Sequence, residues 1–96
     1  MDVQFRLRAE RDVESAAQWY EAKLAGLGRR FIDEVDRAVC EIAEHPTAYP
    51  SVHRDIRRAL VATFPFALYY VVRGDTLVVI AIVHTRRRPQ SWRQQT

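Results

Sequence analysis

The chain has 96 residues, 48% hydrophobic and 28% charged, which is typical of one globular domain over residues 1–96 rather than of a disordered segment. A single cysteine, Cys40, excludes an internal disulfide, and the three histidines (His45, His53 and His84) lack metal-ligand spacing, so we expect no metal and no cofactor. The N-terminus has no secretory pattern and the longest apolar run is too short to span a bilayer. The sequence therefore predicts a cytoplasmic protein without a membrane partner.

Charge is unevenly distributed along the chain. Residues up to Ser51 carry a net charge of minus three, and those from Val52 onward carry plus six. The second half holds eight arginines against two acidic residues, which favours an anionic partner, either nucleic acid or an acidic protein segment. Arginine suits bidentate contacts with phosphate and carboxylate groups, although arginine-rich codon usage would produce the same composition.

The first predicted element is a short strand at the N-terminus. Val3, Phe5 and Leu7 alternate with polar residues, which is the period of a strand with one buried face. From about Glu10 the apolar spacing becomes helical, and Gly26 is expected to end this helix with a left-handed cap. The apolar stripe of the helix is Val13, Ala16, Ala17, Tyr20 and Leu24.

A second helix is predicted directly after this glycine. It ends at His45, because the following Pro46 disfavours helical geometry at the residue before it. The short junction Gly26–Gly28 forces the two helices into an antiparallel hairpin whose apolar stripes face a common sheet. The stripe of the second helix is Leu27, Phe31, Val35, Ala38, Val39 and Ile42.

Three strands are predicted in the second half, after an irregular connection over Pro46–Asp55. They are Ile56–Thr63, Phe66–Arg73 and Leu77–His84, and a tight turn with Gly74 at positive φ joins the last two. The predicted fold class is therefore α+β with the order β-α-α-β-β-β. In this fold a helical hairpin packs on a small, mainly antiparallel sheet.

Several short motifs, each present once, follow one another in a distinctive order along nearly the whole chain. They are Ala9-Glu10-Arg11-Asp12-Val13, Trp19-Tyr20-Glu21, Gly26-Leu27-Gly28 with Phe31, Pro46-Thr47-Ala48-Tyr49-Pro50, Ile56-Arg57-Arg58, Phe64-Pro65-Phe66-Ala67-Leu68-Tyr69-Tyr70 and His84-Thr85-Arg86-Arg87-Arg88-Pro89-Gln90-Ser91-Trp92. Their order and spacing resemble the RelE/ParE superfamily of small bacterial toxins. Its members are the toxic halves of type II toxin–antitoxin pairs, often called plasmid stabilisation proteins. The resemblance implies the same strand–helix–helix–sheet fold.

The superfamily divides by target. RelE-like members resemble endoribonucleases that cut mRNA on the ribosome, whereas ParE-like members poison DNA gyrase. The Phe64-Pro65-Phe66 segment and the ending with His84, Arg87, Pro89 and Trp92 look more like the ParE side. RelE-like members typically place lysines and a C-terminal tyrosine around the scissile phosphate. Here no tyrosine follows Tyr70 and the only lysine is in the first helix, although some ribonuclease members use histidine instead.

His84 is the candidate for acid–base chemistry if the protein is a ribonuclease. Metal-independent RNA cleavage needs a base, an acid and cations around the phosphate, and His84, Arg57 and Arg87 would supply them. The alternative is a structural histidine, packed at the end of the last strand, and we favour it. By alternation His84 shares a face with Val78, Ile80 and Ile82.

Arginines and tryptophans are the candidates for binding the target or the antitoxin. The run Arg86–Arg88 has no nearby carboxylate, and Trp19 lies off the core stripe, where an exposed ring can anchor a partner. The alternative for the arginine run is that it is an ordinary solvated charge run. The alternative for Trp19 is that its ring is partly buried at the edge of the sheet. The candidate set is Arg57, Arg58, Arg86, Arg87, Arg88, Trp92 and Trp19, with Arg57 and Arg58 on opposite faces of their strand.

The resemblance implies a ParE-like toxin that inhibits growth, acts on DNA gyrase and is not itself an enzyme. A cognate antitoxin with an acidic, partly disordered tail would neutralise it in a hetero-oligomer. Two alternatives stay open. One is a RelE-like endoribonuclease that cuts mRNA on the ribosome, and the other is a degenerate, non-toxic copy that only binds the antitoxin.

Overall fold

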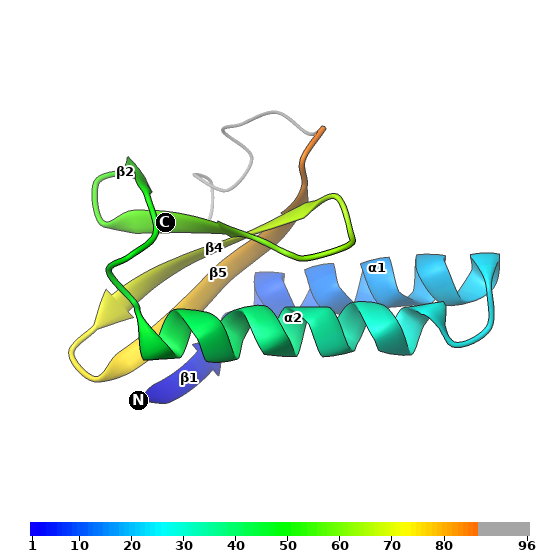
Figure 1. The fold of residues 1–96 in the computed structure, drawn as a ribbon, viewed down its shortest axis with the longest axis horizontal. Helices are drawn as coiled ribbons and strands as arrows, with labels where there is room; N and C mark the ends of the chain where they lie inside the picture. Colours follow the sequence, from blue (N-terminus) through cyan, green and yellow to red (C-terminus); the bar gives the residue numbers. More distant parts are fainter. Residues whose placement is uncertain (87–96) are drawn as a thin grey trace.

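The computed structural model describes residues 1–86, and they form two layers, a helical hairpin and a five-stranded sheet (Figure 1). The elements in chain order are β1 (Asp2–Phe5), α1 (Leu7–Lys23), α2 (Leu27–Glu44), β2 (Ser51–His53), β3 (Ile56–Leu60), β4 (Phe66–Arg73) and β5 (Thr76–His84). The predicted α+β fold is confirmed. One short strand, β2, is additional, because three residues are too few to show an alternating pattern in the sequence.

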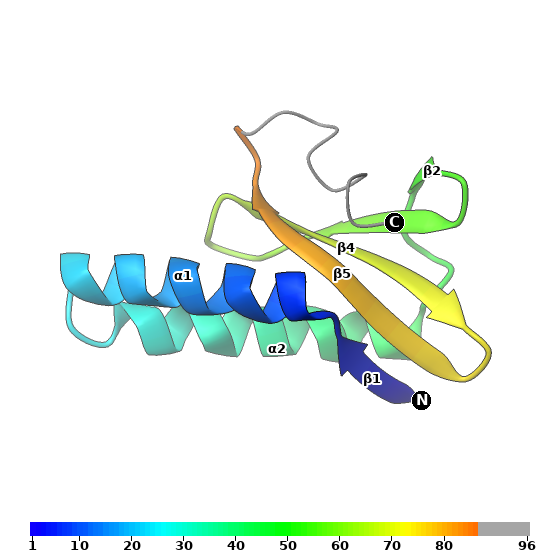
Figure 2. The ribbon, with the colours of Figure 1, turned by 180° about the vertical axis from the view of Figure 1, so that it is seen from behind.

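The sheet has the order β1-β5-β4-β3-β2, and all neighbours are antiparallel except β1 and β5. Strand β1 pairs with only the first part of β5, from Asp2 opposite Thr76 to Phe5 opposite Val79. Beyond that point α1 runs beside β5 in place of a strand, as Figure 2 shows. No helix among residues 1–86 is long and apolar enough to cross a membrane.

Helix α1 begins three residues earlier than the apolar spacing predicts. The N–H of Arg6 still donates to Val79 in β5, at 3.0 Å, but the carbonyl of Arg6 already accepts the N–H of Glu10. Leu7 is therefore the first helical residue and is 59% exposed, so its prediction as a strand residue is wrong. Leu24, predicted in the stripe, lies beyond the last helical residue and is 62% exposed.

The turn between the helices is held by the side chain of Glu21. Its carboxylate accepts the N–H of Gly26 at 2.9 Å and the N–H of Gly28 at 3.0 Å. Gly26 has the predicted left-handed backbone, with φ of 90°, but it is the N-cap of α2 rather than the end of α1. A Cβ on Gly28 would lie 2.5 Å from the carbonyl oxygen of Ala17, so only glycine allows the helices to approach this closely. The hairpin loop extends beyond the sheet (Figures 1 and 2).

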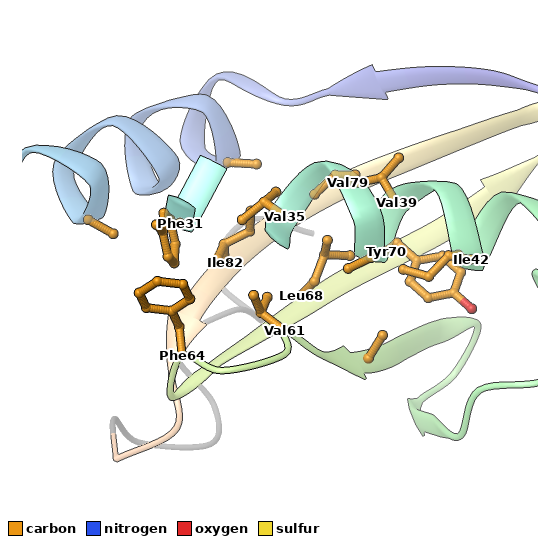
Figure 3. Close-up of a cluster of buried hydrophobic side chains, with 14 of the residues drawn as sticks. Phe31, Val35, Val39, Ile42, Val61, Phe64, Leu68, Tyr70, Val79 and Ile82 are labelled. Carbon is orange, nitrogen blue, oxygen red and sulfur yellow. The ribbon is translucent and has the colours of Figure 1, made fainter. Parts of the chain in front are cut away.

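The main core lies between the helices and the sheet, as the buried side chains in Figure 3 show. Five of the six residues predicted for the stripe of helix α2 are buried, and the sixth, Leu27, is partly buried and packs against the core. A second buried cluster lies on the other face of the sheet. It consists of Ile56, Ala67, Tyr69, Val71, Ile80, Ala81 and Val83.

A β-bulge in β5 changes which side chains face the helices. Tyr69 of β4 pairs with Ala81, whereas the next residue, Tyr70, pairs with Val79, so Ile80 has no partner in β4. An extra residue in one strand shifts the alternation by one position. The helix face of β5 therefore changes from odd-numbered residues before the bulge to even-numbered residues after it.

Candidate functional site

A groove of about 710 Å³ lies between α1 and the carboxyl end of β5. It brings together three residues predicted as candidates, Trp19, His84 and Arg86, which come from opposite ends of the chain. The remaining wall is mostly apolar. It comes from α1, from β5, and from the start of β4 with the residue before it. These lining residues include Ala16, Tyr20, Pro65, Phe66 and Ile82.

The wall near Trp19 is a cluster of packed aromatic rings. Tyr20 lies against the rings of Phe31, Phe64 and Phe66, with centroid distances of 5.5, 4.8 and 6.2 Å. Burial raises the pKa of Tyr20 above the ordinary value of a phenol. Trp19 packs edge-on against Tyr20 at 5.2 Å but is 58% exposed, because it lies off the core stripe as predicted. A large ring is thus presented to solvent on a rigid support.

His84 lies at the opposite wall of the groove. Its ring packs edge-on against Phe66 at a centroid distance of 5.2 Å, and its Nδ1 accepts the backbone N–H of Arg86 at 3.1 Å. The predicted face is correct for Ile82 but wrong for Val78 and Ile80, which lie on the other side of the sheet because of the bulge. His84 is accordingly half-buried at a groove rather than enclosed in a strand core.

Asp12 lines the groove beside β5. Its carboxylate accepts the backbone N–H of Ile82 at 2.9 Å and pairs with Arg8 at 3.1 Å. The side chains of Asp12 and Arg8 are only 14% and 20% exposed. Sequence reasoning does not identify Asp12, because its backbone partner is 70 residues away and nothing in the local pattern indicates it.

Arg57 and Arg58 lie on opposite faces of β3, as predicted, and outside the groove. The guanidinium of Arg57 donates to the carbonyl oxygens of Thr47 and Tyr49, at 3.2 and 2.5 Å, and so holds the turn that leads into β2. Arg58 donates to the hydroxyl of Tyr69 on the other face, at 3.2 Å. The structure therefore does not bring Arg57 together with His84.

Arg87, Arg88 and Trp92, the other predicted binding residues, lie outside the described residues 1–86. Within that range no three metal-ligating side chains come together. A smaller, polar depression of about 220 Å³ lies on the sheet face away from the helices. There a hydrogen bond from Arg73 holds the pKa of Asp55 below its ordinary value.

A family model described as the ParE toxin of the type II toxin–antitoxin system parDE matches residues 3–89. The chain belongs to the ParE toxin family. Among solved structures it is similar to the chromosomal ParDE toxin–antitoxin system from P. aeruginosa. The TM-score is 0.65 and the identity 16%, over 88% of this chain and 95% of that chain, so the likeness is one of fold. No curated protein gives a significant match.

Membership of the ParE family confirms the resemblance on which the toxin interpretation is based. The protein is thus a ParE toxin of a type II toxin–antitoxin system, and such a system implies an antitoxin partner. The arrangement of the groove adds the chemistry available to that ParE toxin. It offers an exposed tryptophan, an aromatic wall and a cation, which suit the binding of another protein.

Proposed function

We propose that this ParE toxin inhibits growth by acting on DNA gyrase, and that residues 1–96 act as a single toxin domain in the cytoplasm. In the same proposal a cognate antitoxin with an acidic, partly disordered tail holds the toxin inactive in a hetero-oligomer. The family match over residues 3–89 supports a target-binding poison of the ParE kind. The geometry of His84 supports it over the ribonuclease alternative.

His84 is poorly arranged to act as a general base. Because its Nδ1 accepts the N–H of Arg86, the neutral ring carries its proton on Nε2. Neither nitrogen then has a lone pair available to take a proton from a 2′-hydroxyl. Arg57, the predicted phosphate ligand, donates instead to two backbone carbonyls in a turn. Among residues 1–86 the predicted base and the predicted phosphate ligand thus lie apart, and each has a backbone partner.

A supercoiling assay with purified gyrase tests the target. We expect expression of the chain alone to arrest growth, and the purified protein to inhibit supercoiling or to trap cleaved gyrase–DNA complexes. Co-expression of the neighbouring open reading frame, the candidate antitoxin, should restore growth. Normal gyrase activity together with new mRNA 5′ ends at codon boundaries would refute gyrase as the target and favour ribosomal mRNA cleavage. Absence of growth arrest would favour the degenerate copy.

A further inference from the structure

The charges of the described residues are separated between the two layers of the fold. Helices α1 and α2 carry nine acidic and six basic residues. The rest of residues 1–86, which forms the sheet and its turns, carries three acidic and six basic residues. The helices cover one face of the sheet, so the acidic layer lies on that side. An anion is therefore attracted to the opposite face, which we call the outer face.

The depression of about 220 Å³ on the outer face is surrounded by cations. Three arginines from distant parts of the chain line it: Arg6 before α1, Arg54 in the turn between β2 and β3, and Arg73 at the end of β4. All three are exposed, so their guanidinium groups are accessible to a ligand. The depression crosses three adjacent strands, and its buried floor residues are Ile56, Val71 and Ile80.

Asp55 neutralises only part of this positive charge. It is the one carboxylate in the lining, against three guanidinium groups. Arg73 donates to it from Nη1, at 2.5 Å, and the same nitrogen donates to the carbonyl oxygen of Val72 at 3.3 Å. A guanidinium has five N–H donors, so the other nitrogens of Arg73 keep donors for a further anion.

Arg54 has an unfavourable backbone conformation in the turn that brings it to the depression. Its φ is 52°, in the left-handed region that glycine or asparagine adopts with less strain. Either of those residues would suit the turn better, but only the arginine supplies a cation to the depression. Strained residues of this kind are concentrated at functional sites, which favours a binding role for Arg54.

The span and the lining of the depression favour duplex DNA as the anion. Arg6 lies beside β5 and Arg54 precedes β3, so their backbones are at least two strand spacings, or roughly 10 Å, apart. The closely spaced charges of a DNA backbone suit this span better than a single inorganic phosphate does. Proteins that bind single strands stack the bases on aromatic rings, and no phenylalanine, tyrosine or tryptophan of residues 1–86 lines the depression.

From these observations we infer that the depression on the outer face binds the phosphate backbone of duplex DNA. Arg6, Arg54 and Arg73 are the binding residues, and Asp55 limits the affinity. Contacts to phosphates carry no sequence information, so the binding does not depend on the base sequence. The inference goes beyond the proposed function, because the toxin itself then holds DNA, and it does not depend on gyrase as the target.

The test measures the affinity of the purified chain for a labelled DNA duplex of about 20 base pairs by fluorescence anisotropy, between about 50 and 200 mM salt. Arg54→Gln should weaken binding about tenfold at the lowest salt concentration. It should also reduce the slope of log K against log salt by about one, because one phosphate contact is lost. Asp55→Asn should tighten binding, because it releases Arg73. The matched control, Arg30→Gln, removes an exposed charge from α2, in the helical layer, and should bind like the wild type.

Three outcomes would overturn the inference. Wild-type affinity of Arg54→Gln, with circular dichroism confirming that the variant is folded, would assign DNA binding to other cations. Equal losses in Arg54→Gln and Arg30→Gln would show an effect of net charge alone. Tighter binding of a single-stranded RNA or of polyglutamate, lost in Arg54→Gln, would assign the depression to that ligand instead. A wild-type chain that binds the duplex but leaves gyrase active would refute only the proposed function.

Discussion

Tyr70 links the core to the turn that precedes β2, and its hydroxyl gives a sharp test of how the fold is stabilised. It is the largest fully buried side chain among the described residues, and its hydroxyl donates to the carbonyl oxygen of Pro46 at 2.6 Å. Burial raises its pKa to about 12, despite the opposing effect of the nearby Arg57 cation. The phenol must therefore stay neutral in the folded state well above its ordinary pKa.

Tyr70→Phe removes the hydroxyl and keeps the ring. At neutral pH we expect the variant to lose about 1–2 kcal/mol of unfolding free energy, because the carbonyl of Pro46 loses its donor in a half-buried position. The side chain volume changes little, so a cavity contributes little to the loss. Far-UV circular dichroism during urea unfolding measures the difference.

At alkaline pH the order of stability should reverse, so that Tyr70→Phe has the larger free energy of unfolding. The unfolded wild type releases the Tyr70 proton from about pH 10, whereas the folded protein retains it until about pH 12. The stability contributed by the neutral phenol is thus complete below pH 10 and is lost as the pH rises towards 12, at about 1.4 kcal/mol per pH unit. Phenylalanine has no such loss. The two stability curves should therefore cross at about pH 11.

Urea unfolding of both proteins between pH 8 and pH 11.5 gives the two curves. A difference that stays constant over this range would refute the raised pKa of Tyr70. Equal stability of the two proteins at pH 8 would refute the contribution of the hydrogen bond to Pro46.

Substitutions of four further residues test the helical hairpin and the turn before β2, each by urea unfolding. Gly28→Ala should destabilise the protein by about 1–2 kcal/mol, because the new methyl group meets the Ala17 carbonyl and overpacking outweighs the gain in helix propensity. Glu21→Ala should cost about 1–2 kcal/mol and Glu21→Gln less, since glutamine keeps an acceptor for the amides at the start of α2; equal losses would contradict a role for the charge. Arg57→Ala should lower the free energy of unfolding by about 1–2 kcal/mol, because Arg57 donates to two backbone carbonyls. Arg58→Ala should lower it by less, because Arg58 donates to the hydroxyl of Tyr69 instead.

The sequence predicts several residues of the candidate site one by one, but it does not predict how they are placed relative to one another. The helical period placed Trp19 off the core stripe, and the charge pattern singled out Arg86. Asp12 was missed, because a carboxylate in the first turns of a helix normally indicates only a favourable interaction with the helix dipole. Its role depends on the N–H of Ile82, which the fold brings beside α1.

The sequence by itself determined the α+β class, the helical hairpin and the ParE family, because these follow from local periods and from motifs in order. The tertiary structure alone decided the parallel pairing of β1 with β5 and the face on which His84 lies. The run Leu77–Val83 is apolar throughout, so the sequence gives no sign of a bulge. The bulge at Ile80 is defined by the pairing with β4, in which Tyr69 lies opposite Ala81 and Tyr70 opposite Val79. That shift of one residue turns His84 towards Phe66 and completes the groove with Trp19.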